Sequence, residues 1–132
     1  PFGKAEKVEE GDAITIVTWG ALVQKSKEAV RNKSISADII DLRTLNPLDM
    51  ETILGSVKKT NRVLIAHEDN ITGGFGAEIA ARITSEGFQY LDAPIKRVAS
   101  LDSPVPYSSV LENEILVQTE WIENAIDELI KF

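Results

Sequence analysis

The chain has 132 residues, of which 43% are hydrophobic and 27% charged, a composition typical of one globular domain with its own core. It has no cysteine, which excludes disulfides, thiolate metal sites and cysteine nucleophiles. Its formal net charge of −7 argues against nucleic acid and anionic membranes as partners, and no apolar run is long enough to span a bilayer.

The first residues, Pro1-Phe2-Gly3-Lys4, read like the tail of a linker and lack an initiator methionine. We therefore expect a fragment of a longer chain. Residues 1–12 are predicted to be a linker segment leading into one domain at residues 13–132.

Strand-like and helix-like patterns alternate along the chain. β-Branched and apolar runs predict strands, and apolar residues at helical spacing predict amphipathic helices. Asp49 is predicted to cap a helix, and Gly87 to occupy the C′ position of the next one. Residues 103–108 contain two prolines and are expected to be irregular. The predicted elements in order are a strand at 13–19, a helix at 22–31, a strand at 37–42, a helix at 49–59, a strand at 63–66, a helix at 75–87, a strand at 95–99 and a helix at 121–130.

This alternation predicts the fold class. We expect an α/β fold, a single three-layer α/β/α domain with a mostly parallel sheet of about five strands and helices on both faces.

The stretch from Arg62 to Glu78 reads as a buried strand, a polar turn with the only histidine, a glycine cluster and a helix start. In open α/β sheets, ligands bind at such carboxyl ends of strands. His67, with Glu68 and Asp69 beside it, is a candidate general acid or base oriented by a carboxylate. The alternative is a histidine hydrogen-bonded at a strand end or an interface. One histidine with scattered carboxylates lacks metal-ligand spacing.

Gly73, Gly74 and Gly76 precede and open the predicted helix, whose free backbone N–H groups form a candidate anion site. The stretch lacks the lysine of a P-loop, and Ile79 stands where the dinucleotide fingerprint needs its third glycine. The alternative is that these glycines let the helix start pack closely against the strand.

Two further residues are candidates for binding charged groups. Arg43 follows the second strand, and its guanidinium could bind a carboxylate or phosphate, with an ion pair inside the domain or at an interface as the alternative. Phe132 follows an amphipathic helix that could hold its carboxylate at a fixed surface position for a basic partner.

Five motifs occur together in the order and spacing of a known family. They resemble the C-terminal domain of the beta chain of the 2-oxoacid dehydrogenase first component, and the similarity runs from Gly3 to Phe132. The Leu-Arg-Thr-Leu run and the His67-Glu68 pair favour this branch over transketolase and deoxyxylulose-phosphate synthase, which end in the same domain. The motifs are Asp-Leu-Arg-Thr-Leu-Asn-Pro-Leu-Asp at 41–49, His-Glu at 67–68, Thr-Gly-Gly-Phe-Gly-Ala-Glu-Ile at 72–79, Leu-Asp-Ala-Pro-Ile-Lys-Arg-Val at 91–98 and Pro-Val-Pro-Tyr at 104–107.

The resemblance implies an enzyme of pyruvate or branched-chain type that decarboxylates a 2-oxoacid and reductively acylates the lipoyl groups of its acyltransferase. Thiamine diphosphate and magnesium would sit between the alpha chain and the N-terminal half of the beta chain. We therefore expect no bound cofactor or metal in this fragment, no catalytic residue beyond the candidate His67, and no activity of the fragment alone. The implied location is the cytoplasm of a bacterium or the mitochondrial matrix of a eukaryote.

The resemblance also implies partners. They are the alpha chain, the N-terminal half of the beta chain, a second beta chain and the peripheral-subunit-binding domain of dihydrolipoyl acyltransferase. In pyruvate-type relatives that domain docks on an acidic residue and on the beta chain's terminal carboxylate, matched here by Asp92 and Phe132. The corner from His67 to Gly76 would then meet a neighbouring domain or subunit.

Two alternatives stay open. The first is the C-terminal domain of a transketolase or deoxyxylulose-phosphate synthase, acting on a sugar phosphate. The second is a stand-alone anion-binding or nucleotide-binding α/β module that uses the helix start at 73–76.

Overall fold

The structure, a computed structural model, describes residues 3–101 and 116–132. The irregular segment expected at 103–108 lies outside them. Within the described ranges, no helix is long and apolar enough to cross a membrane. The elements in chain order are β1 (Glu6–Glu9), β2 (Ile14–Thr18), α1 (Leu22–Lys33), β3 (Ala37–Asp41), α2 (Met50–Thr60), β4 (Val63–Asn70), α3 (Phe75–Gly87), the 3₁₀ turn η1 (Phe88–Tyr90), β5 (Lys96–Ser100) and α5 (Thr119–Leu129).

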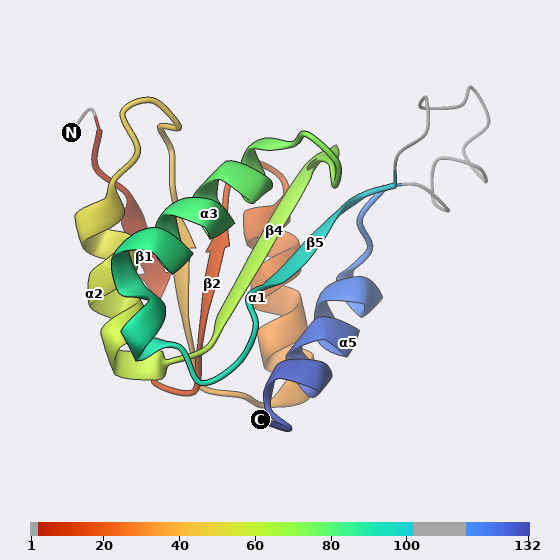
Figure 1. Cartoon of the computed structure of the whole chain (residues 1–132). Helices are drawn as coiled ribbons and strands as arrows, with labels where there is room; N and C mark the ends of the chain where they lie inside the picture. The colour runs from red at the N-terminus through yellow and green to blue at the C-terminus, as the bar shows by residue number, and fades with distance from the viewer. Residues whose placement is uncertain (1–2, 102–115) are drawn as a thin grey trace.

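The strands form one five-stranded sheet in the order β1-β3-β2-β4-β5 (Figure 1). β3, β2, β4 and β5 pair in parallel, and β1 pairs antiparallel with β3 at one edge. The mostly parallel sheet of about five strands is therefore confirmed.

Helices cover both faces of the sheet, as predicted, and Figure 1 shows α3 in front of it and α1 behind. Alternate strand residues supply the two cores, because successive side chains point to opposite faces. Ile14 and Ile16 pack on the side of α1 and α5, whereas Val17 packs on the side of α2 and α3. The result is a three-layer α/β/α domain with a core in each interface.

Two strands differ from the sequence prediction. Glu6–Glu9, within the predicted linker segment, forms the edge strand β1, whose charged residues give no strand-like alternation. β4 runs on to Asn70 instead of ending at Ala66, because Asn70 pairs with Ser100 of β5 across an irregularity. His67 therefore belongs to a strand and not to a turn.

Of the two predicted helix ends, one is confirmed and the other is wrong. Asp49 is confirmed as the cap of α2, since its side chain accepts a hydrogen bond from the Thr52 backbone N–H at 3.1 Å. Gly87 is not a C′ residue, because the helix continues through it into η1. A Cβ atom there would lie 2.9 Å from Leu54 Cδ2, so Gly87 lets α3 pack closely against α2.

The carboxylate of Asp38 joins β3 to three other parts of the chain. It is fully buried and accepts hydrogen bonds from Gly11 N at 2.9 Å, Ser56 Oγ at 2.6 Å and Lys59 Nζ at 2.8 Å, with Lys7 Nζ at 3.2 Å. Burial alone would raise the pKa of Asp38, but these donors outweigh it and hold the pKa below the usual 3.8.

The chain reverses its winding between β2 and β4. β2 leads into α1 on one face, whereas its neighbour β4 leads into α3 on the other. In doubly wound folds, the crevice between two such strands is where ligands bind. The carboxyl ends of β2 and β4 are therefore the place in this fold where a functional site is expected.

Candidate functional site

Three aromatic rings pack together at the carboxyl ends of the neighbouring strands β2 and β4. The His67 imidazole stacks on the Trp19 indole with ring centroids 5.2 Å apart and planes inclined by 6°. Phe75, at the start of α3, meets Trp19 edge-on at 6.5 Å. His67 is fully buried, so the crevice that could admit a ligand in such folds is occupied by side chains here.

Neither ring nitrogen of His67 has a hydrogen-bond partner among the described residues. That His67 is hydrogen-bonded at a strand end or an interface therefore stays a prediction. Burial lowers the pKa of His67 below its usual 6.5; the Asp69 carboxylate opposes this shift and the Arg97 guanidinium adds to it. The fold thus favours the neutral ring. Whether His67 acts as an acid or base stays a prediction.

Each of the three candidate glycines is required by the local structure, but the cause differs between them. Gly73 has a φ of 76°, a left-handed conformation that glycine adopts without strain. A Cβ on Gly74 would lie 2.0 Å from the Asn70 carbonyl oxygen, and one on Gly76 would lie 2.2 Å from His67 Nε2. The first turn of α3 therefore packs directly on the strand end and the imidazole, while the anion role of these glycines remains a prediction.

An open pocket of about 570 Å³, here called the edge pocket, lies beside this helix start. Residues from the loop after β3 form one side of it: Leu45, Asn46 and Leu48. Residues from the end of β4 and from α3 form the other: Asp69, Gly73, Gly74, Phe75, Glu78 and Arg82.

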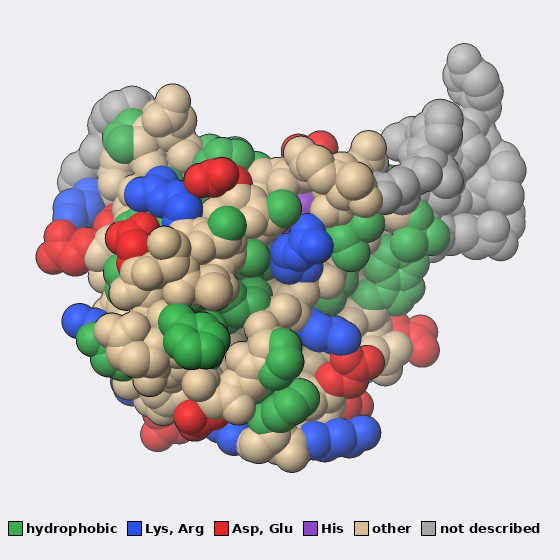
Figure 2. All heavy atoms as spheres, in the orientation of Figure 1, with side chains coloured by type: hydrophobic (Ala, Val, Ile, Leu, Met, Phe, Trp, Pro, Cys, Tyr) green, Lys and Arg blue, Asp and Glu red, His purple; other side chains and the backbone are tan. Residues whose placement is uncertain are grey.

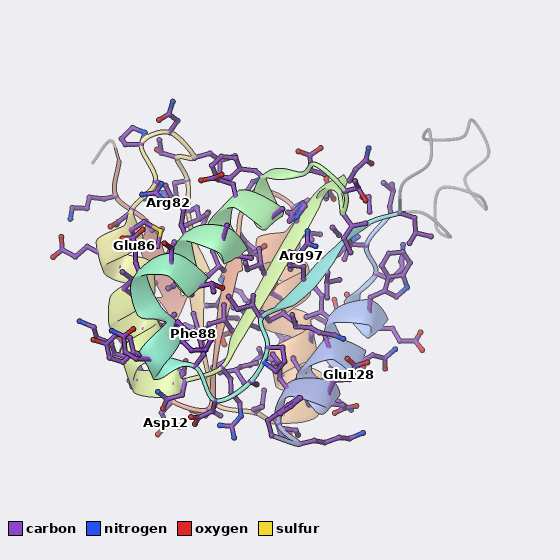
Figure 3. The ribbon with its side chains drawn as sticks, viewed as in Figure 1. Asp12, Arg82, Glu86, Phe88, Arg97 and Glu128 are labelled. Atoms are coloured by element: carbon purple, nitrogen blue, oxygen red, sulfur yellow. The ribbon has the colours of Figure 1, made fainter. Side chains whose placement is uncertain are left out.

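The charges of the edge pocket are mixed. Asp69 and Glu78 supply two carboxylates, and Arg82 supplies one cation whose Nε lies 3.7 Å from the Glu86 carboxylate. Figure 3 shows Arg82 and Glu86 close together on the side of α3. An anion would meet two like charges here, so the electrostatics do not favour a phosphate site.

Arg43 and Glu68, two further predicted site residues, are exposed and do not line the edge pocket. Arg43 has a positive φ of 59° and forms a surface ion pair of 3.5 Å with Glu6 of β1. The backbone oxygen of Glu68 accepts a hydrogen bond from the Ser100 hydroxyl, which ties β4 to β5.

The other two predicted residues, Asp92 and Phe132, come together in a second pocket, here called the apolar groove. It has a volume of about 490 Å³ and is lined by Thr84, Phe88, residues 91–95 and Phe132. Asp92 is exposed, and the Phe88 and Phe132 side chains are 69% and 61% exposed. Figure 2 shows hydrophobic surface gathered towards the lower part of this face, below α3. An exposed carboxylate thus borders an uncovered aromatic surface.

Hydrogen bonds hold the two ends of the apolar groove. The backbone N–H of Asp92 donates to Asn61 O at 2.8 Å, and Asn61 Nδ2 donates to Tyr90 O at 2.7 Å. The Arg62 guanidinium donates to an oxygen of the Phe132 carboxylate, the group predicted to meet a basic partner. The groove shares no lining residue with the edge pocket, so the structure divides the predicted site residues between two separate surfaces.

Sequence reasoning missed several residues of these surfaces. Trp19 is the last residue of a predicted strand and stands before Gly20, and that position at the carboxyl edge was the available signal. Phe88 lies just outside the predicted helix, where a large apolar residue has no core to join. Arg82 and Arg97 gave no signal, because their roles depend on which strands and helices become neighbours.

No group of three or more His, Cys, Asp or Glu side chains within residues 3–101 and 116–132 could hold a metal ion.

Comparison with known proteins gives a consistent family. The family model described as "Transketolase, C-terminal domain" matches residues 3–122. A mitochondrial pyruvate dehydrogenase E1 component subunit beta from Dictyostelium discoideum is 45% identical over 128 residues, which are 95% of this chain and 36% of the relative. A mitochondrial 2-oxoisovalerate dehydrogenase subunit beta from the same organism is 50% identical over 110 residues, 80% of this chain and 30% of the relative.

A solved structure described as a split gene transketolase, inactive beta4 tetramer, has the same fold. It superposes with a TM-score of 0.82 at 24% identity and covers 98% of this chain and 42% of the other. The chain spans about a third of the length of the curated relatives.

Proposed function

This chain belongs to the family of transketolase C-terminal domains, and we propose that it is an assembly domain of a 2-oxoacid dehydrogenase first component. The intact enzyme would decarboxylate a 2-oxoacid and transfer the acyl group reductively to lipoyl groups of an acyltransferase. The supporting observation is the match to beta subunits of pyruvate and 2-oxoisovalerate dehydrogenases at 45% and 50% identity.

In this proposal, the catalytic centre lies outside the chain. The chain corresponds to about a third of such a beta subunit, and its described residues offer no cluster for a metal ion. Thiamine diphosphate and magnesium would be held by the alpha chain and the N-terminal half of the beta chain. When bound there, the cofactor supplies the carbanion chemistry of decarboxylation, to which no residue of this chain is assigned.

The apolar groove is the proposed docking surface for the peripheral-subunit-binding domain of a dihydrolipoyl acyltransferase. Asp92 and the Phe132 carboxylate would offer negative charge to a basic partner, and the Phe88 and Phe132 rings offer exposed aromatic surface to an apolar one. Aromatic anchors surrounded by complementary charges are the usual arrangement of a binding hot spot. The net charge of −7 would steer a basic partner towards the domain.

Titration calorimetry of the alpha–beta assembly with the peripheral-subunit-binding domain tests this docking. Asp92→Asn and Phe132→Ala should each weaken binding by about 5-fold or more, and added salt should weaken it further. Glu28→Gln, a change of an exposed carboxylate on α1, is the matched control and should bind like the unmodified assembly. Binding that ignores both groove variants would remove the docking role.

The carboxyl edge is the proposed contact with neighbouring subunits. The exposed Arg43, Glu68 and Gly73 would face the alpha chain, the N-terminal half of the beta chain or a second beta chain, with the buried His67, Gly74 and Gly76 directly beneath this surface. His67→Ala in the complete enzyme should then alter turnover or assembly. If both stay unchanged, this corner only supports the fold of the domain.

Two alternatives are less well supported. A transketolase or a deoxyxylulose-phosphate synthase shares the domain, but the split gene transketolase match at 24% identity speaks for the fold alone. A stand-alone anion or nucleotide binder is disfavoured by Asp69 and Glu78 beside the helix start. The proposed location is the cytoplasm of a bacterium or the mitochondrial matrix of a eukaryote.

A further inference from the structure

We propose that His67 is a proton-sensitive lock that keeps the first turn of α3 seated on the end of β4, and that protonation of its imidazole releases this turn. The inference does not depend on the proposed function. It concerns a fully buried, titratable ring at the point where the sheet reverses its winding.

The imidazole occupies a closed slot. Trp19 covers one ring face at a centroid distance of 5.2 Å with nearly parallel planes. The start of α3 closes the edge of the ring, because a single carbon added to Gly76 would lie 2.2 Å from Nε2 and one added to Gly74 would lie 2.9 Å from Cε1. No water molecule fits between ring and helix on that side.

The slot accepts only the neutral ring. A protonated imidazole carries two N–H donors and a charge, and both need acceptors or water. Neither nitrogen has a hydrogen-bond partner among the described residues. A ring that gains a proton must therefore acquire a partner by moving out, which requires the helix start to move as well.

The charged groups around the ring do not compensate for this. Asp69, on the same strand, favours the protonated form through its carboxylate and through a backbone hydrogen bond, whereas Arg97 on β5 opposes it. Arg97 is held at this place because its Nη1 donates to Ile71 O at 2.8 Å, and Figure 3 shows it beside β4. Trp19 after β2 and the glycines at 74 and 76, which contact the ring, carry no titratable group. Burial outweighs the Asp69 carboxylate, and the pKa of His67 lies below 6.5.

Release of this turn would change the edge pocket. Gly74 and Phe75 form part of its wall, and Phe75 also meets Trp19 edge-on. A single proton taken up from solvent would thus alter both the aromatic cluster and the pocket beside it. No covalent step or additional reactant is required.

His67 is the only histidine of the chain, so any imidazole signal in an NMR spectrum belongs to it. On the unmodified, tag-free chain, ¹H–¹⁵N spectra between pH 7.5 and 4.5 should show one imidazole that titrates below 6.5. The amide signals of Gly74 and Gly76 should move with the same midpoint. Titration at or above 6.5, or glycine amides that stay unchanged while the ring titrates, would overturn the proposal.

Tryptophan fluorescence provides the second readout. Opening of the stack should expose Trp19 to water and shift its emission to longer wavelength at the midpoint found by NMR. His67→Gln, which cannot take up a proton, should abolish the shift, and Trp19→Phe should remove the signal while the remaining Trp121 stays unaffected. A shift that persists unchanged in His67→Gln contradicts the lock. If His67→Gln fails to fold, the spectra of the unmodified chain decide the question.

Discussion

Gly76 and His67 are in such close contact that a β-carbon on the glycine would lie 2.2 Å from the imidazole Nε2. The glycine sits in the first turn of α3 with ordinary helical geometry, so its small size and not its backbone freedom is what this position requires. The contact fixes where the helix begins relative to β4. It also explains why a glycine cluster that resembles a ligand-binding loop has a structural reason of its own.

Gly76→Ala should lower the free energy of unfolding by about 1–3 kcal/mol, because the added carbon overpacks the buried imidazole. Urea unfolding followed by circular dichroism measures the change. Gly55→Ala is the matched control. Its Cβ would meet no atom within 4 Å in the middle of α2, and it should raise stability by about 0.5–1 kcal/mol. Equal effects of the two changes would contradict the close contact.

The buried hydroxyl of Thr15 predicts a second effect. It lies 2.6 Å from Ser56 Oγ and 2.6 Å from Thr60 Oγ1, so Thr15→Val should cost about 1–3 kcal/mol of stability by removing a shared partner. Thr18→Val tests the same chemical change on the same strand. The Thr18 hydroxyl is buried and has no hydrogen-bond partner within residues 3–101 and 116–132, so its replacement should leave stability unchanged or raise it. Thermal denaturation of both variants separates the two cases.

Asp38 should control part of the acid stability. Its pKa is lowered in the folded chain, so its stabilising contribution is complete above the unfolded value of 3.8 and is lost as pH falls through the folded pKa. Asp38→Asn should therefore be less stable by about 1.5–3 kcal/mol near neutral pH, with the difference shrinking below pH 3.8. Unfolding midpoints between pH 7 and 2.5 measure this, with Asp12→Asn as the control at an exposed carboxylate of the same region (Figure 3). A difference that stays constant with pH would contradict the assignment.

His67 should make stability depend on pH in a higher pH range than Asp38 does. The cause is burial of the imidazole, whereas hydrogen-bond donors cause the effect at Asp38. The lowered pKa of His67 means that the unfolded chain binds a proton more readily, so stability should fall as pH drops from 6.5 towards the folded value. This loss begins near pH 6.5, whereas the loss from Asp38 and Asp49, whose pKa values are lowered, begins only near the unfolded value of 3.8. Two separate steps in a stability curve, the upper one missing in His67→Gln, are the expected result.

The isolated chain should release no carbon dioxide from pyruvate or 2-oxoisovalerate, even with thiamine diphosphate and magnesium added. The reason is that the chain spans about a third of its relatives and that, in the proposed function, the cofactor is held by the alpha chain and the N-terminal half of the beta chain. A coupled decarboxylase assay measures this, with the reconstituted alpha–beta enzyme as the positive control. Turnover by the chain alone would refute the assembly-domain proposal.

The parts of the fold that follow from local pattern were predictable. Val63 to Ala66 is a continuous apolar run because β4 is covered on both faces, and the stripe of Ile122, Ala125 and Ile126 marks α5. β1 escaped prediction because an edge strand needs backbone partners but few apolar side chains. The extension of β4 to Asn70 depends on pairing with Ser100, which no local pattern encodes.

The sequence predicted where the candidate site lies in the fold, but not which side chains contact one another there. Residues 67–76 stand at the carboxyl edge because a glycine-opened helix follows a buried strand. That His67 stacks on Trp19 follows from strand order, since β2 lies between β3 and β4 in the sheet. Asp92 and Phe132 lie 40 positions apart in sequence, and their meeting in the apolar groove depends on how α5 packs beside β5.

The antiparallel strand β1 has a consequence for the solution behaviour of the domain. Its residues Glu6, Lys7 and Glu9 line one border of the sheet with charges, and the pairing with β3 is interrupted between Lys7 and Glu9. Charged and irregular borders resist the edge-to-edge addition of strands that begins aggregation. Lys7 also forms an ion pair with the buried Asp38, and this contact holds the charged strand β1 in place on β3. A chain trimmed back to Gly11 would leave the apolar strand β3 as an open border, ready to pair with another copy.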